Sequence, residues 1–229
     1  MSQDMVWHEV YEALGHEECP VCKLVKKAVN SYIDGFLYEN VNDPMFQERL
    51  RKEKGFCNAH SWLMHSFGEP LAHAILYDAF LRDALAEFNS ALPANAKRKL
   101  RFRSNLGSQS KENQAECKLC KLESDYEKSY LRVIDENVSS QIDFKNKFVE
   151  QGILCVPHMK QYISLSRNSE SLNLVQEIVY AKYQDLLHCL AEIRRKNDYR
   201  FTGEAWTDAE RNAWTKAVEI MVGRKMYEK

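Results

Sequence analysis

The chain has 229 residues, of which 45% are hydrophobic and 28% charged, a composition typical of soluble globular proteins with one or two domains. The formal net charge of −1 argues against a general nucleic-acid-binding or membrane-surface protein. The polar N-terminal segment does not have the pattern of a secretory signal, and no stretch approaches the roughly 18 apolar residues of a membrane span. We therefore expect a cytoplasmic protein without a membrane anchor, where clustered cysteines are more often metal ligands or redox centres than disulfides.

Helices are predicted along the whole chain, since 8 Gly and 5 Pro provide few turns for an all-β fold. The predicted order is a helix over residues 23–39, a turn at Asn42-Asp43-Pro44, a shorter helix and then a long amphipathic helix. The same order follows from residue 121. A last helix is predicted over 208–221, with Thr207 as its N-cap and Gly223 as its stop.

Six of the seven cysteines fall into two copies of one pattern. In each copy a CxxC motif is followed, after 34 residues, by a CxxH motif, and every cysteine and histidine of the first two motifs recurs 98 residues later. A tandem duplication explains this register. The motifs are CPVC at 19–22, CNAH at 57–60, CKLC at 117–120 and CVPH at 155–158.

The two copies predict an all-α protein made of two tandem pseudo-symmetric helical units. We expect the first unit over 1–92, a basic linker over 93–113, the second unit over 114–200, and a C-terminal helix over 201–229 docked on both. The 34-residue spacer is interpreted as a helical hairpin that brings the CxxC and CxxH of one copy together.

Each predicted unit then holds one Cys₃His metal site. Two ligands separated by two residues at the start of a helix lie on one face, and three thiolates with one imidazole suit tetrahedral Zn²⁺. Helix N-termini also favour thiolate over thiol. The predicted ligands are Cys19, Cys22, Cys57 and His60 for the first site, and Cys117, Cys120, Cys155 and His158 for the second.

Three interpretations of the sites stay open. Two structural zinc ions would belong to a non-enzymatic interaction or adaptor module with a protein partner. Two iron–sulfur clusters, each with one His ligand, would indicate electron transfer or redox sensing. Reversible oxidation of the CxxC pairs would indicate a thiol–disulfide oxidoreductase. The sequence lacks a phosphate-binding Gly-rich loop, a GxSxG motif and an HExxH motif, so it favours a protein that is not an enzyme.

Other candidate residues carry weaker signals. The run Lys97–Arg103 has five basic residues in seven, but it lies in the predicted linker and does not by itself indicate nucleic acid. His16 precedes the first CxxC, yet Gln114 occupies the equivalent position in the second copy. Cys189 is interpreted as a core thiol. Trp206 and Trp214, eight residues apart, are interpreted as packing residues on one helical face.

Nearly the whole chain resembles an uncharacterised prokaryotic family, a domain of unknown function common in anaerobic bacteria. The resemblance implies a helical metal-binding protein whose ligands match the eight cysteines and histidines above, and it implies no particular reaction. The segments that carry it are CPVCKL, LYENVNDP (37–44), GFCNAH (55–60), AILYDAFL (74–81), CKLC with LCVPH, and KNDYRF (196–201) before a Trp-containing terminal helix.

Overall fold

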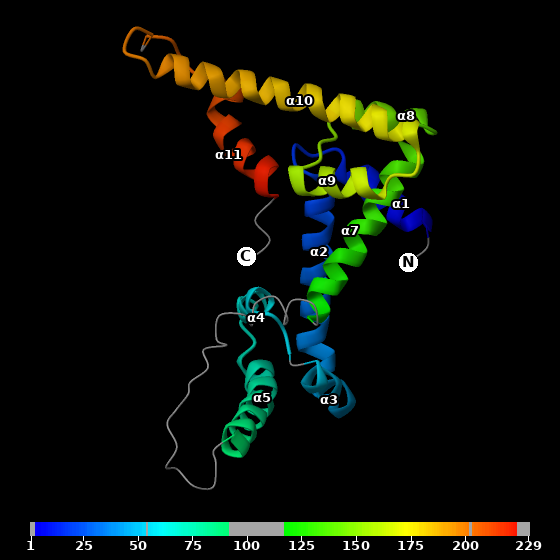
Figure 1. Ribbon diagram of the computed structural model, residues 1–229, viewed down its shortest axis with the longest axis vertical. Helices are drawn as coiled ribbons and strands as arrows, with labels where there is room; N and C mark the ends of the chain where they lie inside the picture. The colour runs from blue at the N-terminus through cyan, green and yellow to red at the C-terminus, as the bar shows by residue number, and fades with distance from the viewer. Residues whose placement is uncertain (1–2, 54, 92–116, 202, 224–229) are drawn as a thin grey trace. The chain divides into compact units, whose positions relative to one another are not determined.

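A computed structural model describes residues 3–53, 55–91, 117–201 and 203–223 (Figure 1). Helices joined by turns make up this part of the chain, and none of its residues is in a strand, which confirms the all-α prediction. None of the described helices is long and apolar enough to cross a membrane. The predicted linker over 93–113, with the basic run Lys97–Arg103, lies outside the described residues.

The helices start where the sequence provides helix-initiating residues. The Asp43 side chain accepts a hydrogen bond from the Met45 amide at 2.9 Å and so caps α3, and Asn168 caps α10 in the same way. The first residues of the four helix pairs α2/α7, α3/α8, α4/α9 and α5/α10 differ by 98 or 99 positions. The elements are α1 (Gln3–Ala13), α2 (Pro20–Gly35), the π-helical turn η1 (Phe36–Asn40), α3 (Pro44–Lys52), α4 (Asn58–His65), α5 (Pro70–Ala91), α7 (Lys118–Asn137), α8 (Ile142–Glu150), α9 (Val156–Leu165), α10 (Ser169–Lys196) and α11 (Asp208–Val222).

The chain divides into two compact units, and each unit combines segments from both sequence copies. Unit 1 comprises the described residues of Met1–Lys27 and Asp125–Met226, and unit 2 those of Ala28–Ser124. The helices α2 and α7 therefore each begin in one unit and end in the other. This division differs from the predicted units over 1–92 and 114–200, which follow the sequence copies.

The core of unit 1 is built from apolar faces of α1, α7, α8, α9 and α10. Its largest fully buried side chains include Phe144 and Phe148 of α8 and Tyr162 of α9. The Tyr162 hydroxyl donates to Asp135 at 2.9 Å, and the Ser166 hydroxyl donates to the same carboxylate at 2.6 Å. These bonds fasten the C-terminal end of α9 to α7, so that the orientation of α9 is fixed.

Helix α11 contacts α10 and α9 of unit 1 (Figure 1). Thr207 and Glu210 form the capping box at its start, and Gly223 follows its last residue, as predicted. Lys196 at the end of α10 donates to the Glu210 carboxylate at 2.8 Å in a buried ion pair. The interpretation of Trp214 as a packing residue is wrong, because this residue of α11 is 62% exposed.

The core of unit 2 lies among the end of α2, η1 and the helices α3, α4 and α5. Buried side chains from each element meet there, and Phe36 of η1 packs against Phe46 and Phe56 with ring centroids 5.0 and 5.8 Å apart. An ion pair between Arg51 and Asp83 connects α3 with α5. The main buried residues are Ile33, Phe36, Leu50, Met64 and Leu76.

Candidate metal centres

The eight predicted ligands gather in two groups of three cysteines and one histidine. Within each group the four ligand atoms all lie within 4.8 Å of one another. We call the group in unit 1 site A and the group in unit 2 site B. Site A consists of Cys19, Cys22, Cys155 and His158, and site B of Cys57, His60, Cys117 and Cys120.

The predicted assignment of ligands to sites is wrong, because the two copies exchange their motifs. Site A pairs the first CxxC with the second CxxH, and site B pairs the second CxxC with the first CxxH. The reason is the unequal length of the helices in the spacer. The helical segment of α2 and η1 runs over 20–40, roughly 30 Å at 1.5 Å per residue, whereas α3 has 9 residues and spans only about 13 Å. The return helix is too short to bring Cys57 back to Cys22.

Each of the four motifs sits at the start of a helix. The first cysteine immediately precedes the helix, and its carbonyl accepts a hydrogen bond from the amide four residues later, at 2.8 to 3.1 Å. The second ligand then lies in the first turn. Two helix N-termini consequently meet at each site, α2 with α9 at site A and α4 with α7 at site B. Their free N–H groups and dipoles stabilise negative charge on the sulfur atoms.

In site A the imidazole of His158 faces three sulfur atoms. Its Nδ1 lies 3.1 Å from Sγ of Cys155 and 3.4 Å from Sγ of both Cys19 and Cys22. The Sγ atoms of Cys22 and Cys155 are 3.6 Å apart. All four residues are buried.

Site B has the same arrangement around His60. Its Nδ1 lies 3.1 Å from Sγ of Cys57, 3.4 Å from Sγ of Cys120 and 3.6 Å from Sγ of Cys117. The Sγ atoms of Cys57 and Cys120 are 3.6 Å apart. Cys120 is half-buried, and the other three residues are buried.

A carboxylate holds the far side of each imidazole. The Nε2 atom of His158 lies 3.4 Å from Glu127, and that of His60 lies 3.1 Å from Glu123. Gln161 also donates to the Glu127 carboxylate at 3.1 Å. A carboxylate on the outer nitrogen selects the tautomer with a free Nδ1 and makes that nitrogen a stronger ligand. The two glutamates were missed from the sequence.

In each group, the ionisation of one thiol makes the ionisation of a neighbouring thiol less favourable. In site A, contacts with Cys19 and Cys22 lower the pKa of Cys155 to about 4, whereas burial and contacts with Cys155 and Cys22 raise the pKa of Cys19 well above its usual value. Burial alone would lower the pKa of His158, but contacts with Cys22 and Glu127 raise it to about 9. One thiolate therefore opposes the ionisation of the next. A bound divalent cation would compensate these negative charges and remove the opposition.

Site B shows the same opposition between neighbouring thiols. Burial opposes ionisation of Cys117, but contact with His60 outweighs it and lowers the pKa of this thiol to about 6. Burial and the neighbouring Cys117 raise the pKa of Cys120 far above its usual value. Burial alone would lower the pKa of His60, yet Cys117 and Glu123 raise it to about 10.

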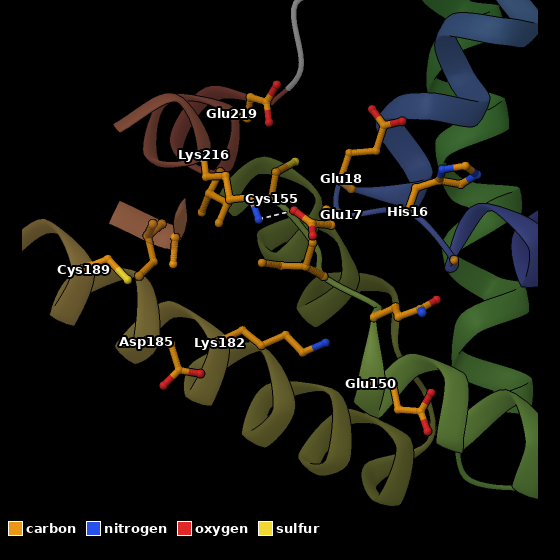
Figure 2. A pocket seen from close by; sticks show the side chains of 17 residues that line it. His16, Glu17, Glu18, Glu150, Cys155, Lys182, Asp185, Cys189, Lys216 and Glu219 are labelled. Atoms are coloured by element: carbon orange, nitrogen blue, oxygen red, sulfur yellow. Dashed lines mark hydrogen bonds and ion pairs between the residues drawn. The ribbon is translucent and has the colours of Figure 1, made fainter. Parts of the chain in front are cut away.

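A pocket of about 600 Å³ opens beside site A (Figure 2). Cys19 and Cys155 form part of its wall, and an ion pair between Glu17 and Lys216 lies across it. His16 and Cys189 also line this pocket, and neither belongs to the group of four ligands.

Comparisons with known proteins place the whole chain in one family. The model of a family of unknown function, DUF6062, matches residues 1–228. The chain is also 31% identical over 212 residues to an "uncharacterized 23.9 kDa protein in xynA 3'region" from Caldicellulosiruptor sp. (strain Rt8B.4), with 93% of this chain and 98% of that protein covered. No solved structure matches the chain.

Proposed function

The chain belongs to this family of unknown function, and we propose that it is a zinc protein whose two Cys₃His sites hold its helices together and catalyse no reaction. The observation that carries the proposal is the close grouping of four ligand atoms, all within 4.8 Å of one another, at each of two sites. The two metal ions would then be part of the folded structure, and the protein would act through contacts with a protein partner.

The distances inside each site support a single tetrahedral ion. With Zn–S and Zn–N bonds of about 2.3 and 2.0 Å, two sulfur ligands lie about 3.8 Å apart and a sulfur and a nitrogen about 3.5 Å apart. The Sγ–Sγ distances of 3.6 Å and the Nδ1–Sγ distances of 3.1 to 3.6 Å are close to these values. A small expansion of each group would accommodate the ion.

An iron–sulfur cluster fits these distances less well. Such a cluster places several iron and sulfide atoms among its protein ligands, which separates the ligand atoms more widely than one ion does. Thiol–disulfide exchange is also disfavoured, because it gives no role to a histidine and a third cysteine, both of which face each CxxC pair.

Four protein ligands complete the tetrahedral coordination of zinc and leave no position for a substrate. The ions would instead join helices that are distant in the sequence, so that their binding free energy becomes folding free energy. A reducing compartment such as the cytoplasm, which the sequence predicts, would keep the thiols available for the metal.

The proposal is tested by metal analysis of full-length protein purified without air. We expect a colourless protein with two zinc ions per chain, and removal of zinc by a chelator should abolish cooperative thermal unfolding. A brown protein with iron and sulfide in near-stoichiometric amounts would contradict the zinc proposal. A protein with neither metal, whose CxxC pairs cycle with a dithiol, would support the oxidoreductase interpretation.

A further inference from the structure

We propose that α11 is the closing element of site A, so that metal binding at this site and docking of the C-terminal end of α11 stabilise each other. This inference rests on the proposed metal function, and it adds a residue outside the ligand set, Gly223. The structure supports it through the backbone of Gly223, the weak anchoring of the C-terminal half of α11, and the pocket beneath that half.

Gly223 lies beside two thiols of site A, with room for about one atom between its main chain and the sulfur atoms. A Cβ atom added to Gly223 would lie 3.5 Å from Sγ of Cys22 and 3.8 Å from Sγ of Cys155. Its dihedral angles, φ 83° and ψ 169°, belong to a region that is occupied almost only by glycine. A Cβ at these distances would be in ordinary van der Waals contact with the sulfur atoms, so the additional methyl groups of a branched side chain would press on them. The positive φ independently favours glycine at this position.

The N-terminal half of α11 is anchored without help from the metal site. The capping box of Thr207 and Glu210 fixes its first turn, and the buried ion pair of Glu210 with Lys196 attaches that turn to α10. Within α11 the buried residues are Glu210 and Ala213, and both belong to this half.

The C-terminal half of α11 has much less support, because its ion pair between Lys216 and Glu17 is solvent-exposed and contributes little stability. Its inward side chains Lys216, Glu219 and Ile220 line the pocket beside site A and do not enter the core (Figure 2). Val218 and Met221 are exposed on the outer face. A segment with so few buried contacts opens at low free energy unless its end is held, and Gly223, which lies beside the thiols, is the point at which site A would hold it.

The two events are linked through the positions of the sulfur atoms. An ion at site A fixes Sγ of Cys22 and Cys155, beside which Gly223 lies. Without the ion, only the packing of α2 and α9 holds these sulfur atoms in place. Because coupling between two equilibria is reciprocal, α11 docking must strengthen metal binding by the factor by which the metal strengthens docking.

The test compares Gly223→Val with a matched control, Gly68→Val, in the full-length zinc protein. Gly68 also has a positive φ, 75°, but a Cβ there would meet nothing within 4 Å, so the control also places a valine at a positive φ without touching a site. The affinity of site A is measured by chelator competition in a Cys57→Ser background, which removes a ligand of site B. We expect Gly223→Val to weaken site A about tenfold, the lower end of the range for residues that support metal ligands, and Gly68→Val to leave it unchanged.

Hydrogen exchange supplies a second measurement that does not depend on a variant. In wild-type protein titrated with a chelator, hydrogen exchange at the amides of residues 216–222 should accelerate at an earlier stage of the titration than exchange at the amides of α8. Simultaneous exposure of α11 and α8, or Gly223→Val with wild-type affinity at site A, would overturn the inference and leave the zinc proposal intact. A wild-type protein that binds no metal at site A would overturn both.

Discussion

Sites A and B use the same four residue types in the same local geometry, yet their surroundings differ. At site A every ligand is buried and Gly223 lies beside two of the thiols. At site B, Cys120 is half-buried. The local geometry follows from the motif at each helix start, whereas the protection of a site depends on elements beyond the motif. We therefore predict that the proposed metal ions leave the two sites at different rates.

The largest effects should come from removing ligands in pairs, which tests the exchanged motifs directly. Cys22→Ser with Cys155→Ser should cost one zinc ion, because both residues belong to site A. Cys22→Ser with Cys57→Ser should cost both ions, because each substitution removes a ligand from a different site. Each lost site should cost a large part of the roughly 10 kcal/mol of binding free energy typical of structural zinc. Zinc content is measured by mass spectrometry under native conditions. One ion remaining in the second double variant would show that each site is formed by the two motifs of one sequence copy.

The difference in protection predicts an order of metal loss. A chelator or a thiol-alkylating reagent should attack site B first, because Cys120 is the most accessible of the ligands. Release is followed with a zinc-responsive dye in the single variants Cys22→Ser, which retains site B, and Cys57→Ser, which retains site A. Faster release from the Cys57→Ser variant would show that the pocket beside site A matters more than the exposure of Cys120.

A smaller and site-specific effect is expected from the glutamates behind the histidines. Glu123→Gln should weaken site B and Glu127→Gln should weaken site A, each by 10-fold to about 100-fold. We expect the larger loss at site B, since the His60–Glu123 distance of 3.1 Å is shorter than the 3.4 Å between His158 and Glu127. Chelator competition measures both affinities.

The matched control for the glutamates is Glu136→Gln, an exposed position on the same helix α7. This variant should leave both affinities unchanged. If Glu136→Gln weakened the sites as much as the other two substitutions, the effect would come from the charge of α7 and not from contact with the imidazoles.

The sequence was sufficient for the local part of each site and insufficient for the pairing of the motifs. The eight residues could be identified because CxxC and CxxH place two ligands on one face of a helix start. The pairing depends on the lengths of α2, η1 and α3, which the 34-residue spacer alone does not reveal. The supporting glutamates had a visible signal, since Glu123 and Glu127 follow Cys120 by three and seven residues and share its helical face. The duplication itself stays a prediction, which the recurrence of helix starts after 98 or 99 residues supports.

The smallest effect should follow from loosening α11 at its far end, away from the thiols. Lys196 holds the pKa of the Glu210 carboxyl below its ordinary value through a 2.8 Å contact, so the pair is charged at neutral pH. Glu210→Gln removes the negative charge that pairs with Lys196 but keeps an oxygen that can accept from the Thr207 amide in the capping box. If α11 protects site A, this variant should release zinc from site A faster, towards the rate of site B, while the release from site B stays unchanged. Asp208→Asn, at an exposed position in the same first turn, is the control. An unchanged release from site A in Glu210→Gln, with faster hydrogen exchange throughout α11, would show that burial by α9 and α2 alone protects the site.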